Sequence, residues 1–182
     1  MTIVIPLASG FEEIEAITVI DMLRRADLEV TTAAVGENPV QGSHEITLFA
    51  DVLLKDLSPS NFTAIVLPGG MPGSQHLKES NTVADFIRDI SSRDGHIAAI
   101  CAAPMVLANT GILQGKKATV FPGFEKFLSD ANLSEEPVVV DGRIITARGA
   151  GCAIPFALKI IEHLKGRESA LQIQRSMQVY WM

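Results

Sequence analysis

Cys101 is the side chain with the clearest chemical potential, because it stands where a predicted buried strand, 96–101, gives way to a predicted helix, 103–110. Small residues follow it, and Pro104 suits the first turn of a helix. Such a corner pushes the side chain out of the backbone, and the N–H groups and dipole of the helix start favour a thiolate. We therefore predict a nucleophilic thiol at Cys101; the alternative is a packed, inert cysteine.

Three carboxylates, Glu12, Glu13 and Glu15, fall at the start of another predicted helix, 12–26. A solvated first turn that complements the helix dipole would explain them without chemistry. Residues this close cannot all point the same way, however, and Glu15 has apolar neighbours on both sides. A buried glutamate has a raised pKa, and its protonated carboxyl can donate a hydrogen bond to a thiolate and shuttle a proton.

The segment 67–73, Leu-Pro-Gly-Gly-Met-Pro-Gly, is dense in glycine and ends a further apolar run, 64–67. A tight turn after a strand is one interpretation. In the other, Gly70 lets its backbone N–H approach a ligand and pairs with the N–H of Ala102 to form an oxyanion hole. The glycine and lysine spacing of a phosphate-binding loop is absent.

The composition predicts one compact domain over residues 1–182, with 47% hydrophobic and 20% charged residues. A net charge of −6 without a basic run argues against nucleic acid and anionic membranes as partners, and favours small molecules. The apolar start is too short for a signal peptide, and no run approaches the ~18 apolar residues of a spanning helix. We therefore predict a cytoplasmic location, with Cys101 and Cys152 as free thiols and Cys152 as a packing residue.

Strand-like apolar runs alternate with helical patterns along the chain. The predicted strands are 2–6, 29–35, 46–54, 64–67, 96–101, 117–120, 137–140 and 143–147, and the predicted helices are 12–26, 82–92, 103–110, 153–164 and 168–177. Asp141-Gly142 predicts a hairpin between the last two strands. The pattern indicates a doubly wound α/β fold, with a mostly parallel sheet covered by helices on both faces. Sites in such folds form at the carboxyl ends of strands, where the three loops described above lie.

The three loops, in this order and spacing, resemble those of the ThiJ/PfpI superfamily over essentially the whole chain. The matching segments are 10–16 (Gly-Phe-Glu-Glu-Ile-Glu-Ala), 67–70 (Leu-Pro-Gly-Gly) and 99–104 (Ala-Ile-Cys-Ala-Ala-Pro). The chain looks most similar to the branch that holds the Parkinson-linked human deglycase and its bacterial YajL-like relatives. The resemblance implies a flavodoxin-like three-layer sandwich and a homodimer. It also implies that Cys101 is the nucleophile, Glu15 its protonated partner, and Gly70 and Ala102 the oxyanion donors.

Two departures from the superfamily's patterns narrow the expected activity. The protease-like branch has a histidine directly after the cysteine, where this chain has Ala102, so we do not expect a peptidase. Some deglycase-branch members carry a further histidine where this chain has Phe121, so Cys101 and Glu15 must suffice. The histidines lack the spacing of metal ligands, and we expect neither a metal nor a cofactor; they are His44, His76, His96 and His163.

The resemblance implies a stress-response enzyme of glyoxalase or deglycase type, a lyase or hydrolase acting on reactive 2-oxoaldehydes or glycated substrates. Cys101 would form a hemithioacetal and Glu15 would relay a proton until a 2-hydroxy acid is released. The alternative is a non-catalytic oxidative-stress sensor or redox-regulated chaperone that uses oxidation of Cys101. Arg25 matches a position that approaches the partner's active site in relatives, although within this chain it is an ordinary cation near a helix end.

Overall fold

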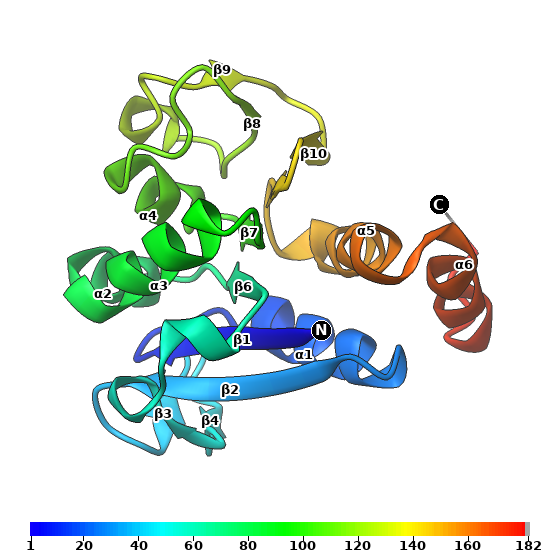
Figure 1. Cartoon of the computed structure of the whole chain (residues 1–182), viewed down its shortest axis with the longest axis horizontal. Helices are drawn as coiled ribbons and strands as arrows, with labels where there is room; N and C mark the ends of the chain where they lie inside the picture. The colour runs from blue at the N-terminus through cyan, green and yellow to red at the C-terminus, as the bar shows by residue number, and fades with distance from the viewer. Residues whose placement is uncertain (181–182) are drawn as a thin grey trace.

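A seven-stranded sheet forms the middle layer of the computed structural model, which describes residues 1–180 (Figure 1). Its strand order is β10-β11-β7-β6-β1-β2-β5. The strands are β1 (Thr2–Ala8), β2 (Glu29–Val35), β5 (Val52–Leu53), β6 (Ala64–Leu67), β7 (His96–Ile100), β10 (Val138–Asp141) and β11 (Ile144–Ala147). Neighbours pair in parallel except β10 and β11, which form the predicted antiparallel hairpin. The predicted α/β class with a mostly parallel sheet is confirmed; residues 181 and 182 of the predicted domain lie outside the described residues.

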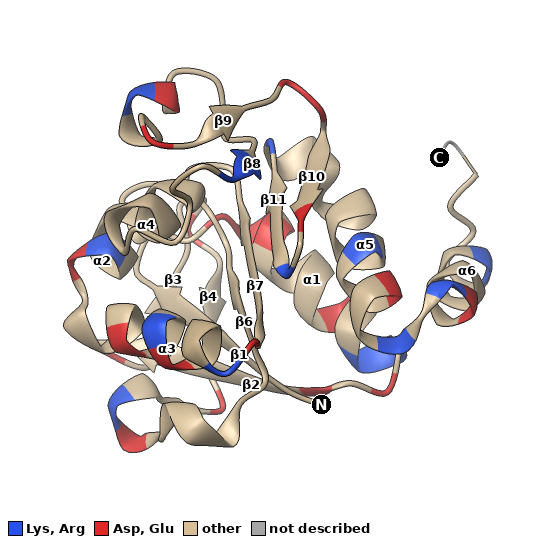
Figure 2. Cartoon of the chain, turned by 45° about the horizontal axis from the view of Figure 1, so that its top comes forward, with Lys and Arg blue, Asp and Glu red and all other residues tan. Residues whose placement is uncertain are grey.

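Helices cover both faces of the sheet, with α1 and α5 on one side and α2, α3 and α4 on the other (Figure 2). The helices are α1 (Glu13–Arg25), α2 (Gly73–Glu79), α3 (Asn81–Ser92), α4 (Pro104–Asn109), α5 (Ala153–Lys165) and α6 (Arg167–Ser176), which packs on α5. Among residues 1–180, no helix combines the length and apolar character needed to cross a membrane.

Alternating side chains of β1 supply the two hydrophobic cores of the molecule. Ile3, Ile5 and Leu7 pack with α1 and α5, whereas Val4 and Ala8 pack with α3 and α4. Successive strand residues point to opposite faces, so an apolar strand of this kind must be covered on both. The central strands are therefore fixed in place, and the loops at their carboxyl ends meet along one edge of the sheet.

Two short strand pairs lie outside the main sheet, and they account for the largest differences from the predicted elements. They are β3 (Val40–Gln41) with β4 (Thr47–Leu48), and β8 (Lys117–Ala118) with β9 (Asn132–Leu133). The mixed strand character predicted over 46–54 is divided between β4 and β5, which belong to different sheets. The side chain of Asn38 bonds both the N–H and the carbonyl of Ala50, at 3.0 Å each. These backbone groups, which lie between β4 and β5, are therefore satisfied without a strand partner. The predictions also missed α2.

Candidate active site

Cys101 sits at a strained corner between β7 and α4. Its φ of 64° lies in the left-handed region, which is uncommon for residues other than glycine. Neighbouring segments hold this backbone: the Cys101 N–H donates to Ala147 O, and its carbonyl accepts from the Phe121 N–H, both at 2.8 Å. Strain of this kind persists only where the surroundings fix it, and it occurs preferentially at functional sites. The turn has the form of the predicted nucleophile elbow, with Pro104 in the first turn of α4.

Glu15 lies under this corner with its side chain completely buried. Its Oε2 accepts a hydrogen bond from the Gly69 N–H at 2.8 Å, and Oε1 has no partner among residues 1–180. The lack of a side chain at Gly69 makes this approach possible, because a Cβ there would lie 2.5 Å from Oε2 and 2.6 Å from the Cys101 Cβ. The structure therefore brings the predicted thiol and carboxyl together across a bare glycine backbone.

Glu15 is buried because of its position in the helical repeat of α1. The flanking isoleucines, which suggested its burial from the sequence, face another direction. Glu15, Val19 and Met22 share the buried face of α1, at spacings of four and three. Ile14 and Ile17, in contrast, are 57% and 40% exposed. The flanking isoleucines that suggested burial thus face the solvent, and Glu15 is buried through its place in the helical repeat.

The two ionisable groups shift each other's proton affinity. Burial raises the pKa of Glu15 to about 7, against hydrogen bonds from the Cys101 thiol and the Gly69 N–H that lower it. Burial, followed by the charge of Glu15, raises the pKa of Cys101 to about 12. This corrects the expectation that the helix start leaves a low-pKa thiol, because burial outweighs the N–H groups. The charge effect vanishes when Glu15 is protonated, so the two groups titrate as a coupled pair that shares its protons.

The backbone N–H groups of Gly70 and Ala102 act on the Cys101 sulfur to lower its pKa, although burial outweighs them. Gly70 has a φ of 90°, and a Cβ there would lie 2.3 Å from the Glu12 nitrogen and 2.6 Å from the Gly10 carbonyl oxygen. Only glycine fits this contact between the loops after β1 and β6. Two convergent N–H donors beside a sulfur can also stabilise an oxyanion that forms on a carbon bound to it.

A second buried carboxylate, Glu13, fastens the β3–β4 hairpin to α1. It is 3% exposed, and it accepts bonds from the His44 N–H at 2.7 Å and from Ile46 N–H at 3.3 Å, while its Oε2 lies 3.0 Å from His44 Nδ1. Although burial opposes it, this set of bonds lowers the pKa of Glu13 to about 2. Ligand atoms of Glu12, Glu13 and His44 lie within 4.8 Å of one another and could hold a metal ion, but both oxygens of Glu13 already bind the hairpin. Sequence spacing did not suggest this group, since His44 joins it from a hairpin 31 residues away.

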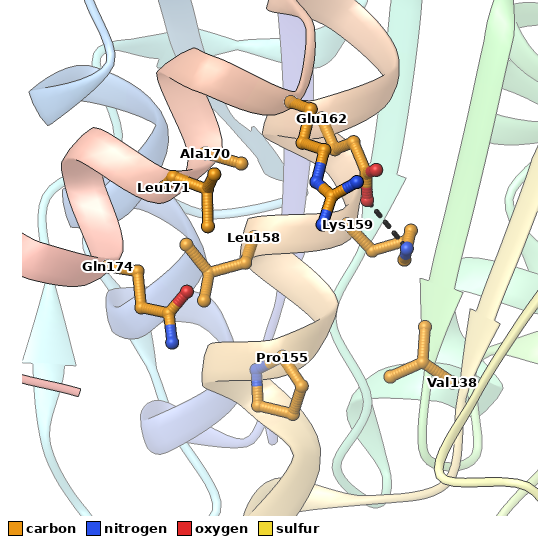
Figure 3. Close-up of a pocket in the computed structure, with 9 residues that line it drawn as sticks. Val138, Pro155, Leu158, Lys159, Glu162, Ala170, Leu171 and Gln174 are labelled. Carbon is orange, nitrogen blue, oxygen red and sulfur yellow. Dashed lines mark hydrogen bonds and ion pairs between the residues drawn. The ribbon is translucent and has the colours of Figure 1, made fainter. Parts of the chain in front are cut away.

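Cys152 is the other thiol that the sequence singled out. Cys152, half-buried beside the start of α5, is a free thiol like Cys101. A hollow of about 320 Å³ opens between α5 and α6, with an ion pair of 2.6 Å between Lys159 and Glu162 on its wall (Figure 3). Its lining includes neither Cys101 nor Glu15, so it is separate from the candidate active site.

Comparison with known proteins places this arrangement in a family. Residues 1–163 match the model of the DJ-1/PfpI family. The chain belongs to this family. Members similar to it include protein dj-1beta of Drosophila melanogaster, which is 41% identical over 176 residues that cover 95% of this chain and 94% of that protein. The crystal structure of Drosophila DJ-1beta superposes with a TM-score of 0.95 at 39% identity, covering 100% of both chains, and confirms the flavodoxin-like fold.

Other relatives are informative through their names or through their length. A Caenorhabditis elegans relative named glutathione-independent glyoxalase DJR-1.2 is 37% identical over 164 residues, covering 86% of this chain and 84% of that protein. The chain spans only 40% and 45% of the length of DJ-1 homologs B and A of Arabidopsis thaliana, at 40% and 42% identity over 96% of this chain. The relatives named here are eukaryotic, so the bacterial YajL-like branch is not established.

Proposed function

We propose that this protein is a glutathione-independent glyoxalase that converts 2-oxoaldehydes to 2-hydroxy acids, with Cys101 as the nucleophile and Glu15 as the proton carrier. The observation that carries the proposal is the buried pair: a carboxyl with a pKa of about 7 against a thiol flanked by two backbone N–H donors. A group that titrates near neutral pH can both give and take a proton during turnover. The name of the Caenorhabditis elegans relative supports the same reaction class.

The reaction would proceed in three balanced steps. The Cys101 thiolate bonds to the aldehyde carbon, and the carbonyl electron pair becomes an oxyanion held by the N–H groups of Gly70 and Ala102 until Glu15 protonates it. Glu15 then takes the proton from this carbon and returns it to the neighbouring ketone carbon, while the proton of the new hydroxyl group passes to the ketone oxygen. The first carbon is thereby oxidised to a thioester and the second reduced to an alcohol. Water hydrolyses the thioester, which releases the 2-hydroxy acid and restores the thiol.

With glycated amines and thiols, the Cys101 thiolate would bond to the hemiaminal or hemithioacetal carbon and displace the amine or thiol, which leaves with a proton from Glu15 and gives the same hemithioacetal on Cys101. A deglycase activity would use Cys101 and Glu15 in the roles given above, and the steps require no metal or cofactor. Peptidase activity is not part of the proposal, because Ala102 stands where a catalytic histidine would follow the cysteine. The bacterial YajL-like branch and the cytoplasmic location also remain predictions.

The direct test is the formation of D- and L-lactate from methylglyoxal without glutathione, in the wild type, Cys101→Ser and Glu15→Gln, after circular dichroism shows that all three are folded. We expect lactate from the wild type alone. Wild-type turnover that persists in either variant would contradict the assigned roles. No turnover by fully reduced wild type would refute the glyoxalase function for this substrate.

The alternative, an oxidative-stress sensor or redox-regulated chaperone, uses the same thiol and stays a prediction. The N–H groups that act on the Cys101 sulfur would also hold the oxygens of a sulfinate. A solved relative at 36% identity, from Toxoplasma gondii, is described as oxidized. Mass spectrometry after graded peroxide treatment separates the two functions, since a sensor should oxidise at Cys101 without any requirement for lactate formation.

We also propose that the protein is a homodimer, through apolar side chains that α1 and the β3–β4 hairpin leave exposed. Phe49 is 80% exposed and Ile46 is 51% exposed, and Glu13 fastens this hairpin beside Ile14 of α1. Large apolar side chains exposed in this way are common at protein interfaces. Arg25, bonded to Asp21 at 2.6 Å, is carried on the same helix. Light scattering should show a dimer for the wild type and for Leu133→Glu, outside this surface, and a monomer for Phe49→Glu.

A further inference from the structure

An exposed aromatic side chain lies on the segment that is bonded to the Cys101 backbone. Phe121 is 43% exposed, although its backbone N–H is bonded to the carbonyl of Cys101 at 2.8 Å. Its ring lies against Gly149, where an added Cβ would be 3.1 Å from the ring carbon Cδ2. Phe124 meets the same ring edge to face, with the centroids 6.4 Å apart. The ring is therefore held against Gly149 and Phe124, on a segment bonded to the Cys101 carbonyl, while part of it faces the solvent.

The order of the sheet places this ring opposite Glu15. The carboxyl reaches Cys101 from the side of β6 and β1, through the Gly69 N–H. Gly149 follows β11, the strand on the other side of β7, and Ala147 of β11 holds the Cys101 N–H. Cys101 is thus flanked by a proton carrier on one side and by an aromatic wall on the other.

We infer that Phe121 determines substrate specificity, and that it favours 2-oxoaldehydes whose ketone carries an aromatic or bulky apolar group over those that carry a methyl group. The inference rests on the proposed glyoxalase function. In the hemithioacetal, the oxyanion is directed to the N–H groups of Gly70 and Ala102, and the carbon that loses its proton is directed to Glu15. The remaining substituent then extends toward β11, where it meets the exposed part of the Phe121 ring.

The size of the effect follows from the contact that an aryl substituent gains and a methyl group does not. A favourable contact between two aromatic rings strengthens an interaction by up to about tenfold beyond the area that it buries. Such a contact forms in both the bound substrate and the transition state, so its loss should raise KM more than it lowers kcat.

The test compares kcat/KM for phenylglyoxal and methylglyoxal in the wild type, Phe121→Ala and Phe127→Ala. Phe127 is a matched control, because it is 37% exposed in the same loop and lies under Lys78 instead of beside Cys101. We expect the preference for phenylglyoxal to fall on the order of tenfold in Phe121→Ala, mainly through KM, and to be unchanged in Phe127→Ala. Equal preferences in the wild type and Phe121→Ala would overturn the inference while leaving the glyoxalase function intact.

A second measurement keeps the inference testable if neither aldehyde is turned over, a result that would refute the proposed function alone. The rates at which N-phenylmaleimide and N-methylmaleimide alkylate Cys101 are each divided by the rate for free glutathione, to remove intrinsic reactivity. The ratio of phenyl to methyl should exceed one in the wild type and Phe127→Ala, and fall several-fold in Phe121→Ala. A ratio that Phe121→Ala does not change would overturn the role of the ring.

Discussion

Replacing Glu15 with glutamine should make the stability of the folded protein less dependent on pH. The folded-state pKa of Glu15 is about 7, above the ordinary value of 4.5 that applies to the unfolded chain. The folded protein therefore binds this proton more tightly. The binding of this proton makes its full contribution to stability below the ordinary glutamate pKa, and the contribution is lost as the pH rises through the folded-state pKa of Glu15.

The difference between the two pKa values corresponds to about 3 kcal/mol of unfolding free energy, because each pKa unit is equivalent to about 1.36 kcal/mol. Most of this loss, about 2.5 kcal/mol, falls between about pH 5 and about pH 8.5. Glutamine has nearly the same shape and can still accept the Gly69 N–H, but it carries no titrating proton. The unfolding free energy of Glu15→Gln minus that of the wild type should therefore increase by about 2.5 kcal/mol from the acid to the alkaline end of this interval, whatever the stability of the variant at the acid end.

Urea unfolding at several pH values measures this difference directly. Because Cys101 is coupled to Glu15, the comparison is repeated with Cys101→Ser and with the double variant, in which the thiol cannot titrate. The two pairs should agree in sign, with the protein that retains Glu15 losing stability toward alkaline pH. In each pair, the unfolding free energy is plotted against pH for the protein with Glu15 and for the protein with glutamine. If the two curves are parallel in both pairs, the reasoning that burial raises the pKa of Glu15 is refuted.

Three further predictions concern the same centre. The rate at which iodoacetamide alkylates Cys101 should rise as the pair loses its first proton, with an apparent pKa near 7, and a rate that is flat through this region would contradict the shared proton. Gly69→Ala should destabilise the protein by roughly 2 kcal/mol or more in urea unfolding, because its Cβ would collide with Glu15 and Cys101, whereas Gly151→Ala, with open space around the added Cβ, should have little effect. Cys101→Gly should be more stable than Cys101→Ala by roughly 1 kcal/mol, because only glycine adopts a φ of 64° without strain; equal unfolding midpoints would show that the corner is unstrained.

The sequence was sufficient to predict the elements that position the site, because strong apolar runs at the centre of the sheet leave little choice. The strands 29–35 and 64–67 have the predicted bounds, and the loops after β1, β6 and β7 do converge. Strand ends and glycine positions are visible in a single sequence and made Cys101, Glu15, Gly70 and Ala102 candidates, whereas their assigned roles came from the family resemblance and stay predictions.

What the sequence could not predict depends on contacts between distant segments. The bonds of Glu13 to the β3–β4 hairpin require His44 to arrive from another element, and no local pattern reports this. The proton affinity of Cys101 was predicted in the wrong direction, because the helix start is a local feature whereas burial and the charge of Glu15 come from the whole fold. The burial of Glu15 was inferred from its apolar neighbours, yet Ile14 and Ile17 face outward.

The central claim is that Cys101 captures the aldehyde carbon and that Glu15 moves the captured species forward. Carbon-13 NMR of the protein with methylglyoxal labelled at its aldehyde carbon tests both parts in one experiment. In Glu15→Gln we expect a long-lived resonance from a sulfur-bonded tetrahedral carbon, absent from Cys101→Ser, while the wild type passes on to labelled lactate. A Glu15→Gln spectrum without this resonance, or one that Cys101→Ser reproduces, would contradict the account.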